Sequence, residues 1–131
     1  MASSVIEVDD GTFEQDVLKS DAALVVVEFT DFYKVNTRGA ANASAKMDAV
    51  IDSLASDDAY TDVRFVRVPI ELDKTKDPIE VTRNSVSAER YAINHGPTTV
   101  FIKNGQEVGS QVVGFYDEQY ITRRIEDALE G

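Results

Sequence analysis

The sequence predicts an α/β domain in which a mixed sheet is flanked by helices on both faces. Residues 24–29 form an almost continuous apolar run rich in β-branched residues, which is typical of a strand buried on both faces, and residues 63–68 predict a second buried strand. Between them, apolar residues at helical spacing predict a helix from about residue 39 to residue 55. The Asn104-Gly105 pair between two later apolar segments is typical of a hairpin turn. The expected order is β-α-β-α-β-α-β-β-α.

The first elements follow from local patterns. Residues 5–8 alternate between apolar and polar side chains and predict a short strand. Asp10 or Thr12 is expected to cap the short helix that follows, because both side chains can accept a hydrogen bond from a free backbone N–H. Phe13 and Val17 give this helix an apolar side.

The middle of the chain has fewer apolar residues. The strand at 63–68 is expected to end at Pro69, because proline cannot donate to a ladder. Residues 71–87 are polar and predict an irregular connection, and residues 88–93 predict a short helix.

The last part predicts a hairpin followed by a helix. Residues 98–102 are expected to form a strand, and residues 108–113 its antiparallel partner, ending at Gly114. Asp117 is expected to cap the final helix, whose apolar face includes Ile121 and Ile125.

Composition limits the classes of function. The 131 residues are expected to form one domain, 1–131. The chain has no cysteine and one histidine, so neither a disulfide nor a metal site built from Cys or His is expected, and no cofactor is predicted. The net charge of −11 argues against nucleic acid and anionic membranes as partners. A solvated surface explains this charge most simply; a high-salt environment and a partner with a basic surface stay open.

The N-terminus has no basic start followed by an apolar run, so no secretory signal is expected. The longest apolar run, residues 22–27, is too short to span a bilayer, so no membrane insertion is expected. We therefore expect a soluble intracellular protein, cytoplasmic by default, with an organelle location left open.

Several segments resemble the thioredoxin family, and together they cover nearly the whole chain. They are Phe13 with Asp16-Val17-Leu18-Lys19, the strand ending in Glu28-Phe29, Tyr91 with Ile93-Asn94-His95-Gly96-Pro97-Thr98, the hairpin Phe101-Ile102-Lys103-Asn104-Gly105, and Val113-Gly114. The resemblance implies a thioredoxin-like fold and a cis peptide bond before Pro97.

The resemblance fails at the reactive motif. The family's Trp-Cys-Gly-Pro-Cys-Lys aligns with Tyr33, Lys34, Val35, Asn36, Thr37 and Arg38. Disulfide exchange needs an attacking thiolate and a second thiol that resolves the mixed disulfide. The sequence therefore predicts a redox-inactive protein that is not an enzyme.

The resemblance predicts that two charged residues, Glu28 and Arg67, face each other. Glu28 lies in the most apolar strand, where a carboxylate must be neutralised or paired. Arg67 aligns with the lysine that faces this acid in the family, so a buried Glu28–Arg67 ion pair is expected. A general base at Glu28 is the alternative.

The residues that replace the cysteines have simple interpretations. Lys34 is expected to be a solvated surface lysine, and a nucleophilic amine that forms Schiff bases is the alternative. Thr37 or Asn36 is expected to cap the long helix.

The predicted contact surface lies at the end of the sheet that carries the reactive motif in the family. Gly96 is smaller than the family's usual apolar residue there and is expected to open space beside Pro97. The insertion around residues 73–87 is a second candidate contact. Partner-binding residues are predicted to be Tyr33, Lys34, Val35, Asn36, Thr37, Arg38, His95, Gly96, Pro97, Thr98, Gly114, Phe115 and Tyr116.

The sequence thus predicts a protein that interacts with other proteins, as a structural or accessory subunit of a larger assembly. One alternative is a chaperone-like module that binds peptides or client proteins through the Pro97 loop. The other is an enzyme with non-thiol chemistry led by Lys34 or Glu28.

Overall fold

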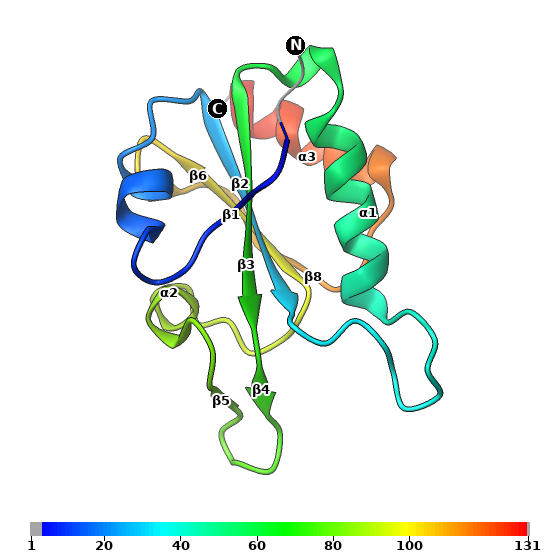
Figure 1. Cartoon of the computed structure of the whole chain (residues 1–131). Coiled ribbons are helices and arrows are strands. Elements are labelled where there is room, and N and C mark those ends of the chain that lie inside the picture. The colour runs from blue at the N-terminus through cyan, green and yellow to red at the C-terminus, as the bar shows by residue number, and fades with distance from the viewer. Residues whose placement is uncertain (1–3, 131) are drawn as a thin grey trace.

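The structure, a computed structural model, describes residues 4–130, and its centre is one mixed sheet (Figure 1). The strands lie in the order β1-β3-β2-β6-β7, with β8 beside β6. Their bounds are β1 (Ile6–Glu7), β2 (Leu24–Asp31), β3 (Val63–Ile70), β6 (Thr98–Lys103), β7 (Gln106–Glu107) and β8 (Val112–Val113). β2 runs parallel to β3 and antiparallel to β6. The predicted mixed sheet is therefore confirmed.

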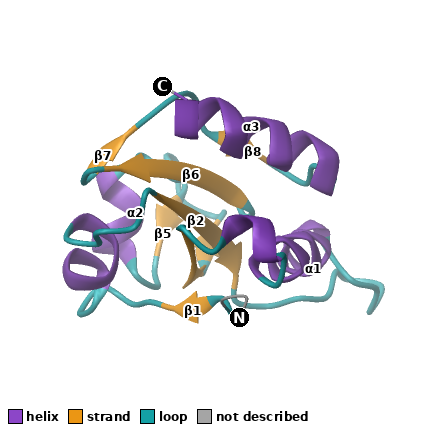
Figure 2. Cartoon of the chain, turned by 90° about the horizontal axis from the view of Figure 1, so that it is seen from above, coloured by secondary structure: helices purple, strands orange, loops and turns teal. Residues whose placement is uncertain are grey.

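Helices cover both faces of this sheet (Figures 1 and 2). They are η1 (Glu14–Leu18), a π-helical turn; α1 (Ala43–Ala55); η2 (Asp58–Tyr60), a 3-10 turn; α2 (Ser85–Arg90); and α3 (Glu118–Glu130). The side chains of β2 alternate between two cores. Val25, Val27 and Phe29 pack with η1 and α2, and Leu24 and Val26 pack with α1 and α3. Burial on both faces explains why this strand is apolar throughout.

Pro69 does not end β3, which continues to Ile70 in register with β2. Arg67 directs its carbonyl away from β2, where it accepts the N–H of Val8 at 2.9 Å. Pro69, two residues on, faces the same way, and the register of β1 ends at Arg67. No ladder partner on that side is therefore deprived of a hydrogen bond by the missing N–H.

Residues 71–87 contain regular secondary structure, whereas an irregular connection was predicted. β4 (Leu72–Asp73) and β5 (Glu80–Val81) form a two-stranded antiparallel sheet, which extends below the main body in Figure 1. Val81 is buried in the core and anchors this hairpin. Helix α2 also begins at Ser85, three residues before the predicted start at residue 88.

Two helix caps differ from prediction. Asp10 does not cap η1; its carboxylate accepts the N–H groups of Val86 and Ser87 and the Ser87 hydroxyl, at 2.6–3.2 Å, and so caps α2. Helix α1 begins at Ala43, where the Asn42 side chain accepts the N–H of Ala45.

The later elements agree more closely with prediction. Asn104 and Gly105 have φ values of 54° and 78°, as the predicted tight turn requires. The Asp117 carboxylate accepts the Tyr120 N–H at 2.9 Å and caps α3. Of the predicted strand at 108–113, only residues 112–113 form a strand, β8. The hairpin partner of β6 next to the turn is β7, which precedes the predicted range, and Gly109 with φ of 68° lies between β7 and β8.

Candidate functional site

The residues aligned with the cysteine motif lie in an exposed loop between β2 and α1, not at the start of a helix. The loop folds back on itself through a β-bridge between Val35 and Ala41. The side chain of Asn36 accepts the N–H groups of Arg38 and Ala40, at 2.8 and 3.1 Å. Asn36 therefore closes this loop and Asn42 caps α1, which corrects the prediction that Asn36 or Thr37 caps the helix.

Two apolar side chains of this loop face solvent. Tyr33 is 65% exposed and Val35 is 60% exposed, so water covers most of both side chains. Phe32 is 44% exposed and contacts the Tyr33 ring edge-on, with 5.1 Å between ring centroids. The loop therefore presents an apolar ridge in the place where the family carries its dithiol.

Lys34 is held in an ion pair at the base of the loop. Its Nζ lies 2.9 Å from Asp48 Oδ2 and donates to Thr30 Oγ1 at 2.6 Å. A nucleophilic lysine needs an amine that is free to attack, whereas Asp48 and Thr30 both hold this amine in place. The geometry thus supports a positioning role for Lys34 between β2 and α1.

Glu28 and Arg67 meet beneath this loop. Arg67 Nε donates to Glu28 Oε1 at 2.8 Å, and the Glu28 side chain is fully buried. Arg67 also lies 3.4 Å from Asp48 Oδ1 and 3.2 Å from Asp52 Oδ1. One guanidinium therefore serves three carboxyl groups.

Burial raises the pKa of Glu28 well above its ordinary value; nearby Asp48 adds to this effect, and Arg67 opposes it. Burial also acts on Asp48, but its interactions with Glu28, Lys34, Thr30 and Arg67 outweigh it and lower the pKa of Asp48. Glu28 Oε2 has no hydrogen-bond partner within residues 4–130.

The peptide bond between Gly96 and Pro97 is cis. Pro97 O accepts the Gly114 N–H at 2.8 Å, and His95 O accepts the Thr98 hydroxyl at 2.6 Å. Segments 95–98 and 114–116 are therefore neighbours.

Pro97 and Thr98, however, are buried, contrary to their prediction as contact residues. His95 is exposed and Gly96 is half-buried, so these two form the accessible part of the segment.

The expected space beside Gly96 is filled. A Cβ atom at Gly96 would lie 2.2 Å from Asp31 Oδ1 and 2.7 Å from Asp31 Cγ, so the carboxyl group of Asp31 occupies that position. Burial raises the pKa of Asp31, against the Ser44 hydroxyl and the charges of Lys74, His95 and Lys34. Sequence reasoning missed Asp31. The available signal was the combination of an acidic residue at the end of the apolar strand, Asp31, and a glycine before the proline, Gly96.

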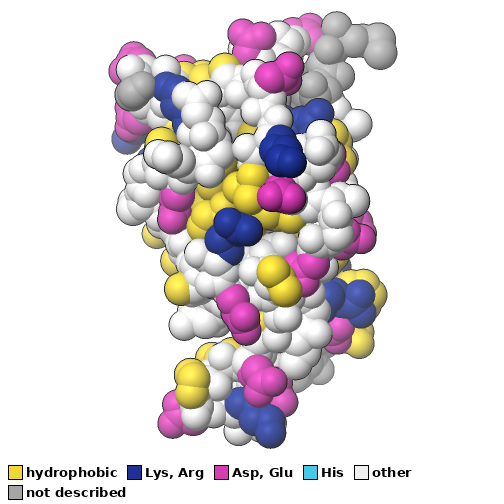
Figure 3. Space-filling model, turned by 90° about the vertical axis from the view of Figure 1, so that its left-hand side faces the viewer, with side chains coloured by type: hydrophobic (Ala, Val, Ile, Leu, Met, Phe, Trp, Pro, Cys, Tyr) yellow, Lys and Arg dark blue, Asp and Glu magenta, His cyan; other side chains and the backbone are white. Residues whose placement is uncertain are grey.

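The β4–β5 hairpin is fastened to the aromatic loop. The Arg83 guanidinium lies 3.9 Å from the centroid of the Phe32 ring, and its Nε lies 2.7 Å from Glu71 Oε2. A hollow of about 220 Å³ separates loop and hairpin, lined by Asp31, Phe32, Tyr33, Val35, Leu72 and Lys74 among others. Figure 3 shows the hairpin as a narrow lower extension with acidic and basic side chains together.

The last predicted contacts belong to the segment before α3. Phe115 is 44% exposed and Tyr116 is 40% exposed, and Tyr116 stacks on Tyr120 with 4.5 Å between ring centroids. Within the part of the chain that the structure describes, no group of three or more His, Asp or Glu side chains is arranged to hold a metal ion.

Comparison with known proteins identifies the family. The thioredoxin-like domain pattern matches residues 16–129. The chain belongs to the thioredoxin-like domain family. It is a member without cysteine. No curated protein shows a significant match to the sequence.

Solved thioredoxins share the fold. Short-form thioredoxin f from spinach chloroplast is 21% identical with a TM-score of 0.74, and the match covers 97% of this chain and 95% of that one. A point-mutant thioredoxin from Halobacterium salinarum NRC-1 is 24% identical with a TM-score of 0.69, covering 98% and 96%. Malassezia sympodialis thioredoxin is 20% identical with a TM-score of 0.67, covering 98% and 95%. Within residues 4–130, no helix combines the length and apolar character needed to cross a membrane.

Proposed function

We propose that this chain is a single-domain, redox-inactive thioredoxin-like protein that acts as a structural or accessory subunit of a larger intracellular assembly. The observation that supports the proposal is the loop that stands in place of the dithiol. A β-bridge within the loop holds it closed, and it exposes an apolar ridge formed by Phe32, Tyr33 and Val35. Exposed aromatic side chains gathered on one surface are typical of protein contacts.

The proposed contact surface combines this ridge with its neighbours. Hydrogen bonding between Pro97 and Gly114 brings the 114–116 segment beside the Pro97 loop. Phe115 and Tyr116 then supply two further aromatic side chains for a partner. Because the chain carries a net charge of −11, a partner with a basic surface would be attracted at long range.

The two alternatives receive less support from the geometry. A peptide groove at the Pro97 loop needs free space beside Gly96, and the Asp31 carboxyl group occupies it. An enzyme led by Lys34 needs an amine that is free to attack a substrate, and the Lys34 amine is held by Asp48.

Crosslinking mass spectrometry of the protein isolated from its native source tests the proposal. We expect one partner set in fixed ratio, with crosslinks from Lys34, Lys74 or Lys76. The double variant Tyr33→Ala/Val35→Ser should lose at least about tenfold in partner affinity, since exposed aromatic anchors dominate such contacts. Val86→Ser is the matched control, because Val86 is 64% exposed on α2. A diffuse set of unrelated proteins, or equal affinity of both variants, would contradict the proposal.

An insulin-reduction assay with dithiothreitol tests the redox claim separately. Without a thiol the chain cannot form the mixed disulfide through which exchange proceeds. We expect the rate with protein to equal the background rate. Turnover above background would refute redox inactivity, whatever the outcome of the crosslinking experiment.

A further inference from the structure

The outer edge of β3 is only partly covered. β1 pairs with β3 at Val66 and Arg67 alone. The first residues of β3, 63–65, therefore have a strand partner only on the β2 side within the described chain. This uncovered edge begins at the upper end of β3 in Figure 1, whereas the loop between β2 and α1 lies near the lower end.

Two hydrogen bonds show which backbone groups face this edge. Asp62 O accepts the Ala23 N–H at 3.0 Å on the β2 side, and Arg67 O accepts the Val8 N–H at 2.9 Å on the β1 side. Successive residues of a strand direct their backbone groups to opposite neighbours. Residues 63, 65 and 67 therefore face outward. The N–H and C=O of Val63 and the N–H of Phe65 have no partner within residues 4–130.

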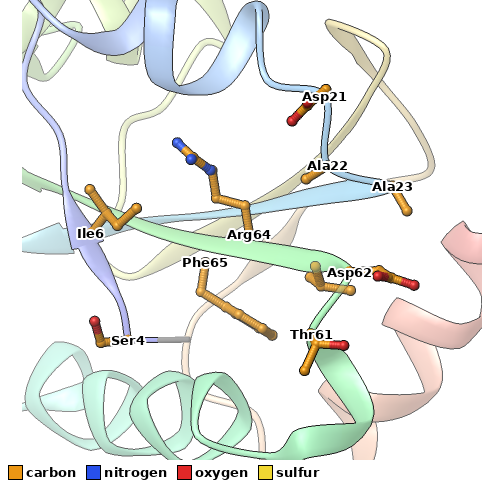
Figure 4. Close-up of a pocket in the computed structure, with 10 residues that line it drawn as sticks. Ser4, Ile6, Asp21, Ala22, Ala23, Thr61, Asp62, Arg64 and Phe65 are labelled. Atoms are coloured by element: carbon orange, nitrogen blue, oxygen red, sulfur yellow. The ribbon is translucent and has the colours of Figure 1, made fainter. Parts of the chain in front are cut away.

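A groove of about 560 Å³ runs along these groups (Figure 4). Arg64 points from β3 toward the side of η1, and Phe65 points to the opposite side, toward α1. Ile6, which is 38% exposed, lines the groove with Thr61 and the two alanines before β2. An extended strand laid here would place alternate side chains on these two sides.

The unpaired charge of the groove is negative. Arg64 is engaged by Asp16, with Nη1 3.3 Å from the Asp16 carbonyl oxygen and 3.9 Å from Oδ1. Asp21 and Asp62 also line the groove, and neither has an ion-pair partner in the described part of the chain. A cationic side chain is therefore the complement that this edge lacks.

We propose that this groove binds an extended segment of a basic partner protein, which adds a strand to β3. The segment pairs its backbone with Val63 and Phe65, and it directs lysine or arginine side chains toward Asp21 and Asp62. Strand addition satisfies edge groups that have no partner within residues 4–130. The groove is separate from the proposed contact surface, so either proposal can be refuted while the other stands.

Amide hydrogen exchange of the full chain tests the edge first. In the free protein we expect the amides of Val63 and Phe65 to exchange at least about tenfold faster than those of Arg64 and Val66, which face β2. Equal protection of all four amides would overturn the proposal, because the edge would already be covered in the free protein.

Binding of a defined peptide tests the occupant. The probe is an acetylated, amidated octapeptide of alternating lysine and valine, and its control has glutamate in place of lysine. We expect the lysine peptide to slow exchange at Val63 and Phe65, and the glutamate peptide to leave both unchanged. No protection by the lysine peptide, protection elsewhere only, or equal protection by both peptides would overturn the proposal.

A charge reversal separates local contact from long-range attraction. Asp21→Lys should weaken peptide binding at least about fivefold, because it removes a carboxylate that lines the groove. Glu126→Lys changes the net charge equally but lies on α3, across the sheet from β1 in Figure 2, and should change affinity less than about twofold. Equal weakening by both variants would show that only net charge attracts the peptide and would overturn the site.

Discussion

The contact between Gly96 and Asp31 leads to a specific prediction. The two residues lie 65 positions apart, and the Asp31 carboxyl group fills the space that a side chain at position 96 would need. In Gly96→Ala, the new Cβ would lie 2.2 Å from Asp31 Oδ1 and 3.1 Å from the Asp31 backbone N. A carbon and an oxygen ordinarily approach to about 3.3 Å, so the overlap is roughly 1 Å. The Asp31 carboxyl group must therefore leave its position. Overpacking of this kind costs about 1–3 kcal/mol.

Urea unfolding of four proteins measures the effect: wild type, Gly96→Ala, Asp31→Ala and the double variant. When Asp31 is truncated, the main clash disappears. Replacing glycine with alanine also lowers the conformational entropy of the unfolded chain, which stabilises the folded state by about 0.4–1 kcal/mol. We expect Gly96→Ala to destabilise the wild type and to be near neutral in the Asp31→Ala background, with a coupling energy of about 1 kcal/mol or more.

Gly11→Ala is the matched control, since a Cβ there meets only Asp9 Oδ1 at 3.3 Å. It should change the free energy of unfolding by less than about 1 kcal/mol. If Gly96→Ala costs the same with and without the Asp31 side chain, then Asp31 does not fill the space and the reasoning is refuted.

Three further predictions concern the buried acid and two caps. The raised pKa of Glu28 means that the folded chain binds its proton more tightly than the unfolded chain does, for which the ordinary value is 4.5. As pH rises from 4.5 through the pKa of Glu28 in the folded chain, the wild type should lose stability relative to Glu28→Gln by up to about 1.4 kcal/mol per pH unit. If the two proteins differ in urea unfolding by the same free energy at every pH, this prediction is contradicted. Asp10→Ala should lower the free energy of unfolding by about 1–2 kcal/mol, because it removes the cap of α2, and amide exchange at Val86 and Ser87 should quicken; unchanged exchange there would exclude the capping role. Asn42→Ala should cost about 1 kcal/mol in urea unfolding, whereas Thr37→Ala should be neutral; the reverse order would restore Thr37 as the cap of α1.

Local signals in the sequence were enough for several elements. The apolar run at 24–29 predicts β2 correctly, because a strand buried on both faces needs apolar side chains at nearly every position. The start of β3 was also predicted, although its end was not. The Asn104-Gly105 turn and the Asp117 cap were predictable because each depends on hydrogen bonds or φ values within three residues. The absence of cysteine likewise excludes dithiol chemistry without reference to the fold.

Other features depended on residues far apart in the chain. Asp10 resembles a cap for its own helix, but the fold brings it to α2, 77 positions away from Ser87. The polar segment at 71–87 has the composition of a loop, yet burial of Val81 orders part of it as a hairpin. Local pattern does not encode such pairings, because the same polar side chain can bond to any partner that the fold brings near it.

Periodicity and residue type were sufficient to establish the α/β sheet and the loss of the dithiol. What replaced the dithiol could be learned only from the folded chain. Folding turned the aligned segment into an exposed loop, paired Lys34 with Asp48, and placed Asp31 against Gly96. These arrangements follow from the packing of β2 against α1 and the Pro97 loop, which brings charged groups into volumes where each must find a partner or displace a neighbour.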